Sequence, residues 1–139
     1  MTDEEFLQAL EDTTLPSAEF DHVGHVRAAF LCLAAARDFP SALARICASI
    51  RKYAAALGQP GRYHETITVG YTALIYQRMH ADASCGKWRE FATANPDLFN
   101  RQLLNRFFPP ELLASDLARN VFILPPRCAC ETSRSAATA

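Results

Sequence analysis

Apolar residues recur at spacings of three and four along most of the chain, whereas no stretch shows the period-two alternation typical of a strand. A first helix is expected from Asp3 to about Glu11, with Thr2 as its N-cap, and the segment 13–17 should end it. A second helix is expected from about Asp21 to Arg37. Its apolar stripe comprises Val26, Ala29, Phe30, Leu33 and Ala36.

Two longer helices are expected in the middle of the chain. Pro40 suits a first helical turn, so a third helix should run from Ser41 to Leu57, and Gly58 is placed to end it at the C′ position. A fourth helix is expected from about His64 to His80. The apolar residues of these helices are Leu43, Ile46, Ile50, Tyr53, Ala54 and Leu57 in the third, and Ile67, Tyr71, Leu74, Ile75 and Met79 in the fourth.

The pattern is less regular after the fourth helix. A short fifth helix around Trp88 should end before Pro96, because proline disfavours continuation of a helix. Another helix is expected within 97–108. The two prolines that precede the segment 110–122 are placed to open a last helix there.

Length and composition agree with one small globular domain. The chain has 139 residues, of which 50% are hydrophobic, and this is enough apolar material for a core. From Pro125 onward apolar residues nearly vanish, which is typical of a disordered segment. The sequence therefore predicts an all-α fold, a single compact bundle of about five to seven helices over residues 1–125, followed by a disordered tail over 126–139.

Charge and targeting patterns narrow the classes of partner. The formal net charge is −1, with 14 basic and 15 acidic residues, and there is no basic stripe of the kind that binds nucleic acid. The chain begins without the features of a secretory signal, and its longest apolar run, Ala28–Ala36, is too short to span a bilayer. We therefore expect a cytoplasmic protein that binds neither nucleic acid nor a membrane. Its five cysteines lack framework spacing and are expected to be reduced.

Three of the four histidines fall in two short motifs, Phe20–Arg27 and Gly61–Thr68. His22 and His25 are three residues apart and so share a helix face, which continues into the apolar stripe of the second helix. His64 is aligned with the stripe of the fourth helix in the same way. All three imidazoles are therefore expected to point inward.

Topology is expected to bring the two histidine motifs together. Short connections make consecutive helices antiparallel neighbours, so the second and fourth helices should run parallel. The three histidines lie in the first turns of these helices and therefore belong at the same end of the bundle. Burial and the positive end of the helix dipole both lower the pKa of a histidine in that position, which favours neutral imidazoles.

Neutral imidazoles close to carboxylates are ligands that divalent transition metals prefer. We therefore expect a metal-dependent enzyme acting on a small metabolite, with His22, His25 and His64 as ligands of zinc, iron, copper or nickel. Glu65 would be a fourth ligand or a general base acting on bound water. Asp21 would cap the second helix or orient one of the histidines.

Two other interpretations stay open. In a metal-free enzyme or lyase, the same His and Glu residues would transfer protons while Arg62, beside Tyr63 at the mouth of the site, would hold an anionic substrate. Alternatively, the histidines form a structural layer in a non-catalytic helical module that binds a protein partner. A homodimer would suit so small a core. The arginines near the motifs are equally candidates for ion pairs: Arg27 and Arg62 with Glu19, Asp21 or Glu65.

The motifs Phe-Asp-His-Val-Gly-His-Val-Arg (20–27) and Gly-Arg-Tyr-His-Glu-Thr (61–66) resemble those of a family of small bacterial proteins. The resemblance takes in 53–58 and 113–119 as well, and so covers most of the chain up to about Pro125. It implies one compact domain and no particular activity. The functional hypotheses therefore rest on the residues themselves.

Overall fold

The computed structural model describes residues 1–84 and 86–126, and every regular element in these ranges is helical, which confirms the predicted all-α fold. The predicted tail, 126–139, lies outside the described residues except for Pro126. The α-helices are α1 (Asp3–Glu11), α2 (His22–Ala35), α3 (Phe39–Ala56), α4 (Glu65–Ala81), α5 (Trp88–Ala94), α6 (Pro110–Leu113) and α7 (Asp116–Asn120). The 3-10 turns are η1 (Ser17–Glu19), η2 (Pro60–Arg62), η3 (Pro96–Phe99) and η4 (Leu103–Arg106).

Side-chain caps fix where the first helices begin. The caps of α1, α2 and α3 are Thr2, Asp21 and Asp38. The first two are the predicted caps, and the Oδ1 atom of Asp21 accepts a hydrogen bond from the N–H of Gly24 at 2.9 Å. Because Asp38 caps α3, this helix begins earlier than predicted, at Phe39. Gly58 follows α3 in the left-handed region, with φ at 72°, as a C′ glycine should.

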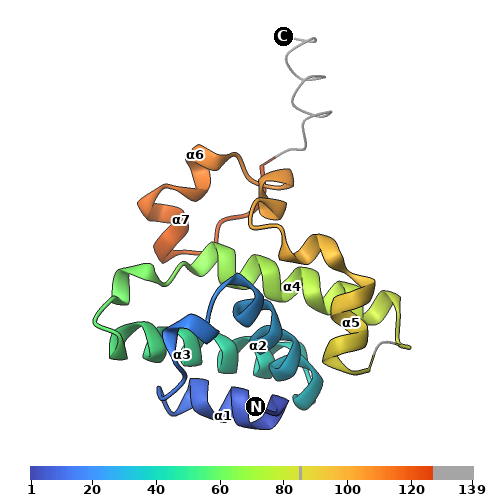
Figure 1. Ribbon diagram of the computed structural model, residues 1–139. Coiled ribbons are helices and arrows are strands. Elements are labelled where there is room, and N and C mark those ends of the chain that lie inside the picture. The colour runs from blue at the N-terminus through green and yellow to red at the C-terminus, as the bar shows by residue number, and fades with distance from the viewer. Residues whose placement is uncertain (85, 127–139) are drawn as a thin grey trace.

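The helices pack in layers around one core (Figure 1). Helix α1 lies against α2 and α3, and α4 covers the other side of the same pair. In Figure 1, α3 and α4 run in opposite directions, as short connections favour. None of the described helices combines the length and the apolar character needed to cross a membrane. The side chains buried deepest in the core include Phe6, Leu10, Phe30, Ile46, Ile75 and Phe91.

Two residues of the predicted apolar stripes are exposed. Leu57 is 43% exposed because it is the C-cap of α3, where the helix already leaves the core. Ile67 is 37% exposed, and its side chain lines a pocket instead of the core. The other stripe residues are buried or packed against the core.

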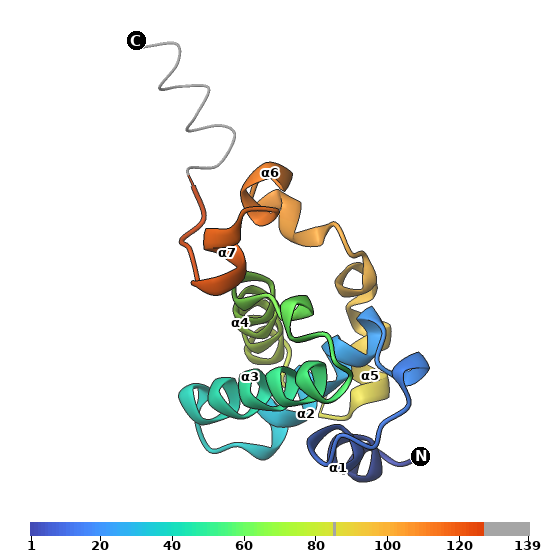
Figure 2. The same cartoon turned by 90° about the vertical axis from the view of Figure 1, so that its left-hand side faces the viewer.

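Residues 95–123, which we call the C-terminal arch, differ most from the predicted helices. Within 97–108 the chain makes the two turns η3 and η4, and over 110–122 it makes two short helices that are separated at Ser115. The Ser115 hydroxyl caps α7 by accepting a hydrogen bond from the N–H of Ala118. Figure 2 shows the arch leaving α5, passing along one side of the bundle and returning to α4 through α7.

Candidate functional site

A pocket of about 340 Å³ lies where the N-terminal ends of α2 and α4 meet. The N-caps of both helices, Asp21 and His64, belong to its lining, and so do His22 and His25. The structure therefore brings together the two histidine motifs, as the topological argument predicted. We call this space the histidine pocket. Its apolar lining includes Phe20, Val26, Ala29, Ile46, Ile50 and Tyr71.

His25 belongs to the lining of this pocket. Its Nδ1 atom lies 3.0 Å from the carbonyl oxygen of Asp21. A carbonyl oxygen only accepts, so Nδ1 carries the proton and Nε2 of the neutral ring keeps its lone pair. No partner for Nε2 is found in the described part of the chain. The imidazole also stacks on the Phe20 ring, with 4.1 Å between the ring centroids, which fixes its orientation.

His25 is more exposed than the sequence predicted, but its pKa is lowered as expected. The residue is exposed and not buried in the core, because its helix face opens into the histidine pocket. Its pKa is nevertheless lowered, chiefly because the protein atoms crowded around the ring remove water from the charged form. The positive charge of nearby Arg62 acts in the same direction. His25 is therefore neutral at pH 7 and is able to accept a proton.

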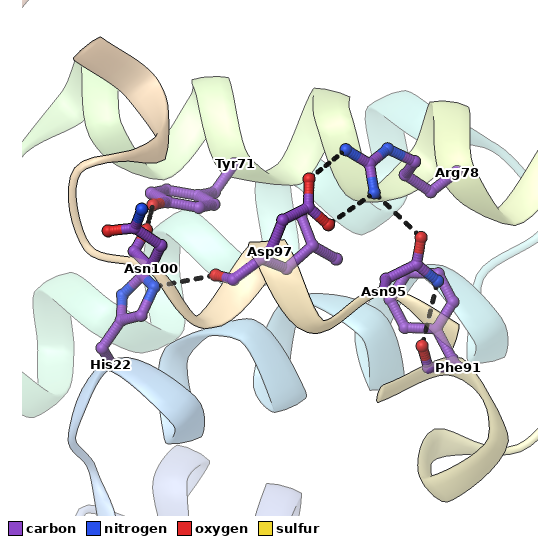
Figure 3. Close-up of polar contacts among 8 residues, drawn as sticks. His22, Tyr71, Arg78, Phe91, Asn95, Asp97 and Asn100 are labelled. Atoms are coloured by element: carbon purple, nitrogen blue, oxygen red, sulfur yellow. Dashed lines mark hydrogen bonds and ion pairs between the residues drawn. The ribbon is translucent and has the colours of Figure 1, made fainter. Parts of the chain in front are cut away.

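His22 is anchored to the C-terminal arch. Its Nε2 atom donates to the carbonyl oxygen of Leu98 at 2.9 Å, and its ring makes a T-shaped contact with the Tyr71 ring (Figure 3). The Tyr71 hydroxyl donates in turn to the carbonyl oxygen of Asn100 at 2.9 Å. Burial raises the pKa of Tyr71 to about 12, so the phenol stays protonated and keeps this bond. The Nδ1 atom of His22 has no hydrogen-bond partner among the described residues.

His64 has a different role, because both of its ring nitrogens are used. It is the N-cap of α4 and not a residue of its first turn, and Nδ1 accepts a hydrogen bond from the N–H of Ile67 at 3.1 Å. The Nε2–H group donates to the carbonyl oxygen of Leu113 at 2.7 Å. His64 is only 8% exposed. It therefore joins the start of α4 to the C-terminal arch.

Glu65 is not part of the pocket lining. It accepts a hydrogen bond from the Tyr63 hydroxyl and forms an ion pair with Arg51, whose Nη2 atom lies 3.1 Å from the Glu65 carboxylate. The Arg51 guanidinium in turn lies over the Tyr63 ring. Burial raises the pKa of Tyr63, which keeps the phenol protonated and the bond to Glu65 intact. Tyr63 itself lines the pocket, as was predicted for the mouth of the site.

Two arginines line the histidine pocket, and neither has a carboxylate partner among the described residues. Arg62 donates to the neutral side chain of Gln59 at 2.9 Å, so the predicted ion pair of Arg62 with an acidic neighbour is wrong. Arg27 also differs from expectation, because its partner is Asp3. The second pocket arginine, Arg101, comes from the C-terminal arch. Sequence reasoning missed it, because periodicity gives no information on where an irregular segment lies.

Gly24, a residue of the first histidine motif, marks a close backbone contact that the sequence could have indicated. A Cβ atom at this position would lie 2.6 Å from the carbonyl oxygen of Glu19, so only glycine lets α2 approach the η1 turn this closely. That approach positions Phe20 and Asp21 at the start of α2. A glycine inside a helix frequently marks such a close backbone contact.

The described residues do not form the predicted metal site, and they do not test whether a metal binds. In the ranges 1–84 and 86–126, no group of three or more His, Cys, Asp or Glu residues is arranged to hold a metal ion. His22 and His25 each keep one ring nitrogen available, whereas His64 would have to release both of its hydrogen bonds to become a ligand. Three-histidine coordination therefore stays a prediction.

The cysteines in the described ranges agree with the expectation of reduced thiols. Cys32 and Cys47 are buried and free. The pKa of Cys32 is raised to about 11 by burial, so this thiol is not a nucleophile at neutral pH. The remaining three cysteines lie outside the described residues.

Comparisons of this chain with protein-family models, with curated proteins and with solved structures found no match. The functional argument consequently rests on the histidine pocket alone.

Proposed function

We propose that this chain is an enzyme that moves a proton on a small organic anion, with His25 as the general base. The observation that carries the proposal is the Nε2 atom of His25, which has no partner among the described residues of a pocket that two uncompensated arginines also line. A general base needs a lone pair at neutral pH, and the lowered pKa of His25 supplies it. This is the metal-free interpretation of the sequence, in which His and Glu residues transfer protons and Arg62 holds the anion, with His25 now the base and Glu65 outside the pocket lining.

Two contacts offset part of the cost of the charged form of His25 that follows proton transfer. When Nε2 takes a proton from substrate carbon, the ring becomes an imidazolium whose Nδ1–H still donates to the Asp21 carbonyl. The Asp21 carboxylate favours this charge as well. The negative charge left on the substrate would face the guanidinium groups of Arg62 and Arg101 and the positive ends of α2 and α4. Isomerisation and elimination reactions of small organic acids can use this combination of groups.

Hydrogen–deuterium exchange tests the proposal without knowledge of the product. The protein is incubated in D₂O with a panel of 2-oxo, 2-hydroxy and arylacetic acids, and loss of the C–H signal is followed by proton NMR. We expect exchange with at least one acid class, a loss of about 100-fold in its rate in His25→Gln, and no change in His80→Gln. His80 is a matched control because it is an exposed histidine outside the pocket lining. Exchange that survives in His25→Gln would contradict the proposal, and so would no exchange with any acid.

A metal-dependent enzyme is the second candidate, and the ring nitrogens that His22 and His25 keep available favour it. Elemental analysis of untagged protein, with His25→Ala and His64→Ala beside the wild type, separates the two candidates. Near-stoichiometric metal that both folded variants lose would favour coordination by these histidines. Deuterium exchange by wild-type protein free of metal would favour acid–base chemistry instead.

A further inference from the structure

We propose that the histidine pocket takes a monocarboxylic acid with an apolar body, and that Arg62 and Arg101 together bind its carboxylate. The inference rests on the proposed function for the choice of site. Its test measures binding alone, so it can fail or succeed independently of any catalytic activity.

The first argument is the charge of the two arginines. In the described ranges, ion pairs neutralise four other arginines: Arg27, Arg45, Arg51 and Arg78. Among the described residues, Arg62 has only the neutral side chain of Gln59 as a partner, and none is found for Arg101. Two guanidinium groups that line one pocket and lack an ion-pair partner among the described residues attract an anion, because their planar donor groups match carboxylate geometry.

The second argument concerns the charge of the ligand. Asp21 is a carboxylate in the pocket lining, although its Oδ1 atom is already engaged in capping α2. Taken by themselves, the two arginines and Asp21 give the lining an excess of one positive charge. A monoanion balances this excess, whereas a phosphate dianion would leave the filled pocket with one uncompensated negative charge. The observations therefore favour a carboxylate.

The third argument is the separation of charged and apolar lining. Arg62 and Arg101 are exposed, whereas Val26, Ala29 and Ile46 are between 0% and 3% exposed. The charged groups consequently lie toward solvent and the apolar side chains lie deeper. A pocket of about 340 Å³ accommodates one small molecule. Its ligand should therefore have a carboxylate at one end and an aromatic or branched aliphatic group at the other.

Arg101 is held in place by the contacts that attach the C-terminal arch (Figure 3). The residue directly before it, Asn100, accepts the hydrogen bond from Tyr71, and Leu98 accepts the one from His22. Tyr71 and His22 line the histidine pocket themselves. The same two side chains thus shape the pocket and fix the backbone that carries Arg101. This makes Arg101 a binding residue on an ordered segment.

Calorimetric titration with matched probes tests the proposal. Phenylacetate is compared with phenylacetamide, which has the same shape without the charge, and with acetate, which lacks the apolar body. We expect both of these to bind at least about tenfold more weakly than phenylacetate. Inorganic phosphate is included as a competing anion. Equal binding of the amide and the acid, tighter binding of phosphate, or no measurable binding of phenylacetate would overturn the proposal.

Variants assign the effect to the two arginines. Arg62→Gln and Arg101→Gln should each weaken phenylacetate binding by about tenfold and reduce the preference for the acid over the amide. Arg89→Gln is the control, because Arg89 is exposed on α5 and outside this pocket. His25→Gln should lower the rate of deuterium exchange about 100-fold while it still binds phenylacetate, which separates the inference from the proposed function. An unchanged preference for the acid in Arg101→Gln would contradict the role given to this residue.

Discussion

The helical bundle and the C-terminal arch are held together in different ways. Helices α1 to α4 have continuous backbone hydrogen bonding and bury their apolar stripes against each other. The arch consists of short turns, and long-range side-chain hydrogen bonds to its main chain attach it to the bundle. These bonds come from His22, His64, Thr66 and Tyr71. A salt bridge from Arg78 to Asp97 adds to them, as Figure 3 shows.

The contrast matters because the histidine pocket lies between the two regions. The bundle supplies the histidines and Arg62, and the arch supplies Arg101. Regular packing positions the proposed base, whereas a few polar contacts position one of the two anion-binding groups. We therefore expect substitutions in the core of the bundle to unfold the protein. Substitutions that remove the hydrogen bonds of the arch should instead disorder the arch side of the pocket and leave the bundle folded.

The largest expected effect comes from the core of the bundle. Phe30 is 1% exposed and packs on Phe91, so Phe30→Ala should lower the free energy of unfolding by about 3–5 kcal/mol. Phe107→Ala is the control, because Phe107 is 44% exposed in the arch and should change stability by less than about 0.5 kcal/mol. Urea denaturation followed by circular dichroism measures both variants. Similar losses in the two would mean that the bundle does not dominate stability.

A smaller effect is expected at His64, which belongs to both regions. His64→Ala removes the N-cap of α4 and the bond to Leu113, and we expect it to lose about 2 kcal/mol. His64→Asn keeps a capping oxygen but does not reach Leu113, so it should lose only about 1 kcal/mol. The same denaturation experiment measures both. If the two variants lose equal stability, His64 does not act as a cap, and attachment to the arch is its whole contribution.

The sequence predicted the bundle well because local rules decide it. Caps such as Thr2 and Asp21, the C′ glycine Gly58 and the spacing of apolar residues fix the long helices within a few residues. The sequence also predicted that the two histidine motifs lie close together, because short connections between helices leave few possible topologies. The prediction for His64 was wrong by one position. The sequence placed it in the first turn of the fourth helix, whereas it is the N-cap of α4, and both of its ring nitrogens are therefore used in hydrogen bonds.

The arch could not be predicted in the same way. Its turns around Leu98 and Asn100 are stabilised by His22 and Tyr71, which lie far away in sequence and leave no local pattern. Arg101 consequently gave no signal of its place in the pocket. Glu65, in contrast, was predicted to belong to the site because it follows His64 directly in the sequence. The ion pair with Arg51 instead holds it outside the pocket lining.

The attachment of the arch through Arg78 should contribute less than His64. Arg78 donates to both carboxylate oxygens of Asp97, but the two side chains are 29% and 38% exposed, so solvent screens the pair. Arg78→Met should therefore lose about 1 kcal/mol. Trp88, the only tryptophan, stacks edge-on against Phe99 in the arch and so reports its attachment by fluorescence. Unchanged emission in the variant would show that the ion pair does not hold the arch.

The same ion pair predicts a dependence on pH. The hydrogen bond from Arg78 holds the pKa of Asp97 below its usual value of 3.8. The stabilisation is therefore complete above that usual value and is lost as the pH falls through the lowered pKa. Trp88 emission of the wild type should change in this acid range while the circular dichroism of the bundle persists. Arg78→Met should lack this step, and a step that persists in the variant would point to another carboxylate.

The smallest effect concerns His25, whose titration compares the proposed base with a histidine outside the pocket. The protein atoms crowded around the ring remove water from its charged form and lower the pKa of His25, so its ring signals in NMR should titrate below the usual value of 6.5. Phenylacetate bound beside it should raise this pKa, because a nearby carboxylate favours the imidazolium. In Arg101→Gln, which binds the anion about tenfold more weakly, the rise should need a correspondingly higher phenylacetate concentration, and the His80 ring signals should not respond to phenylacetate in either protein. If phenylacetate binds tightly but leaves the titration of His25 unchanged, the carboxylate lies too far from the proposed base for Arg101 to present it to His25.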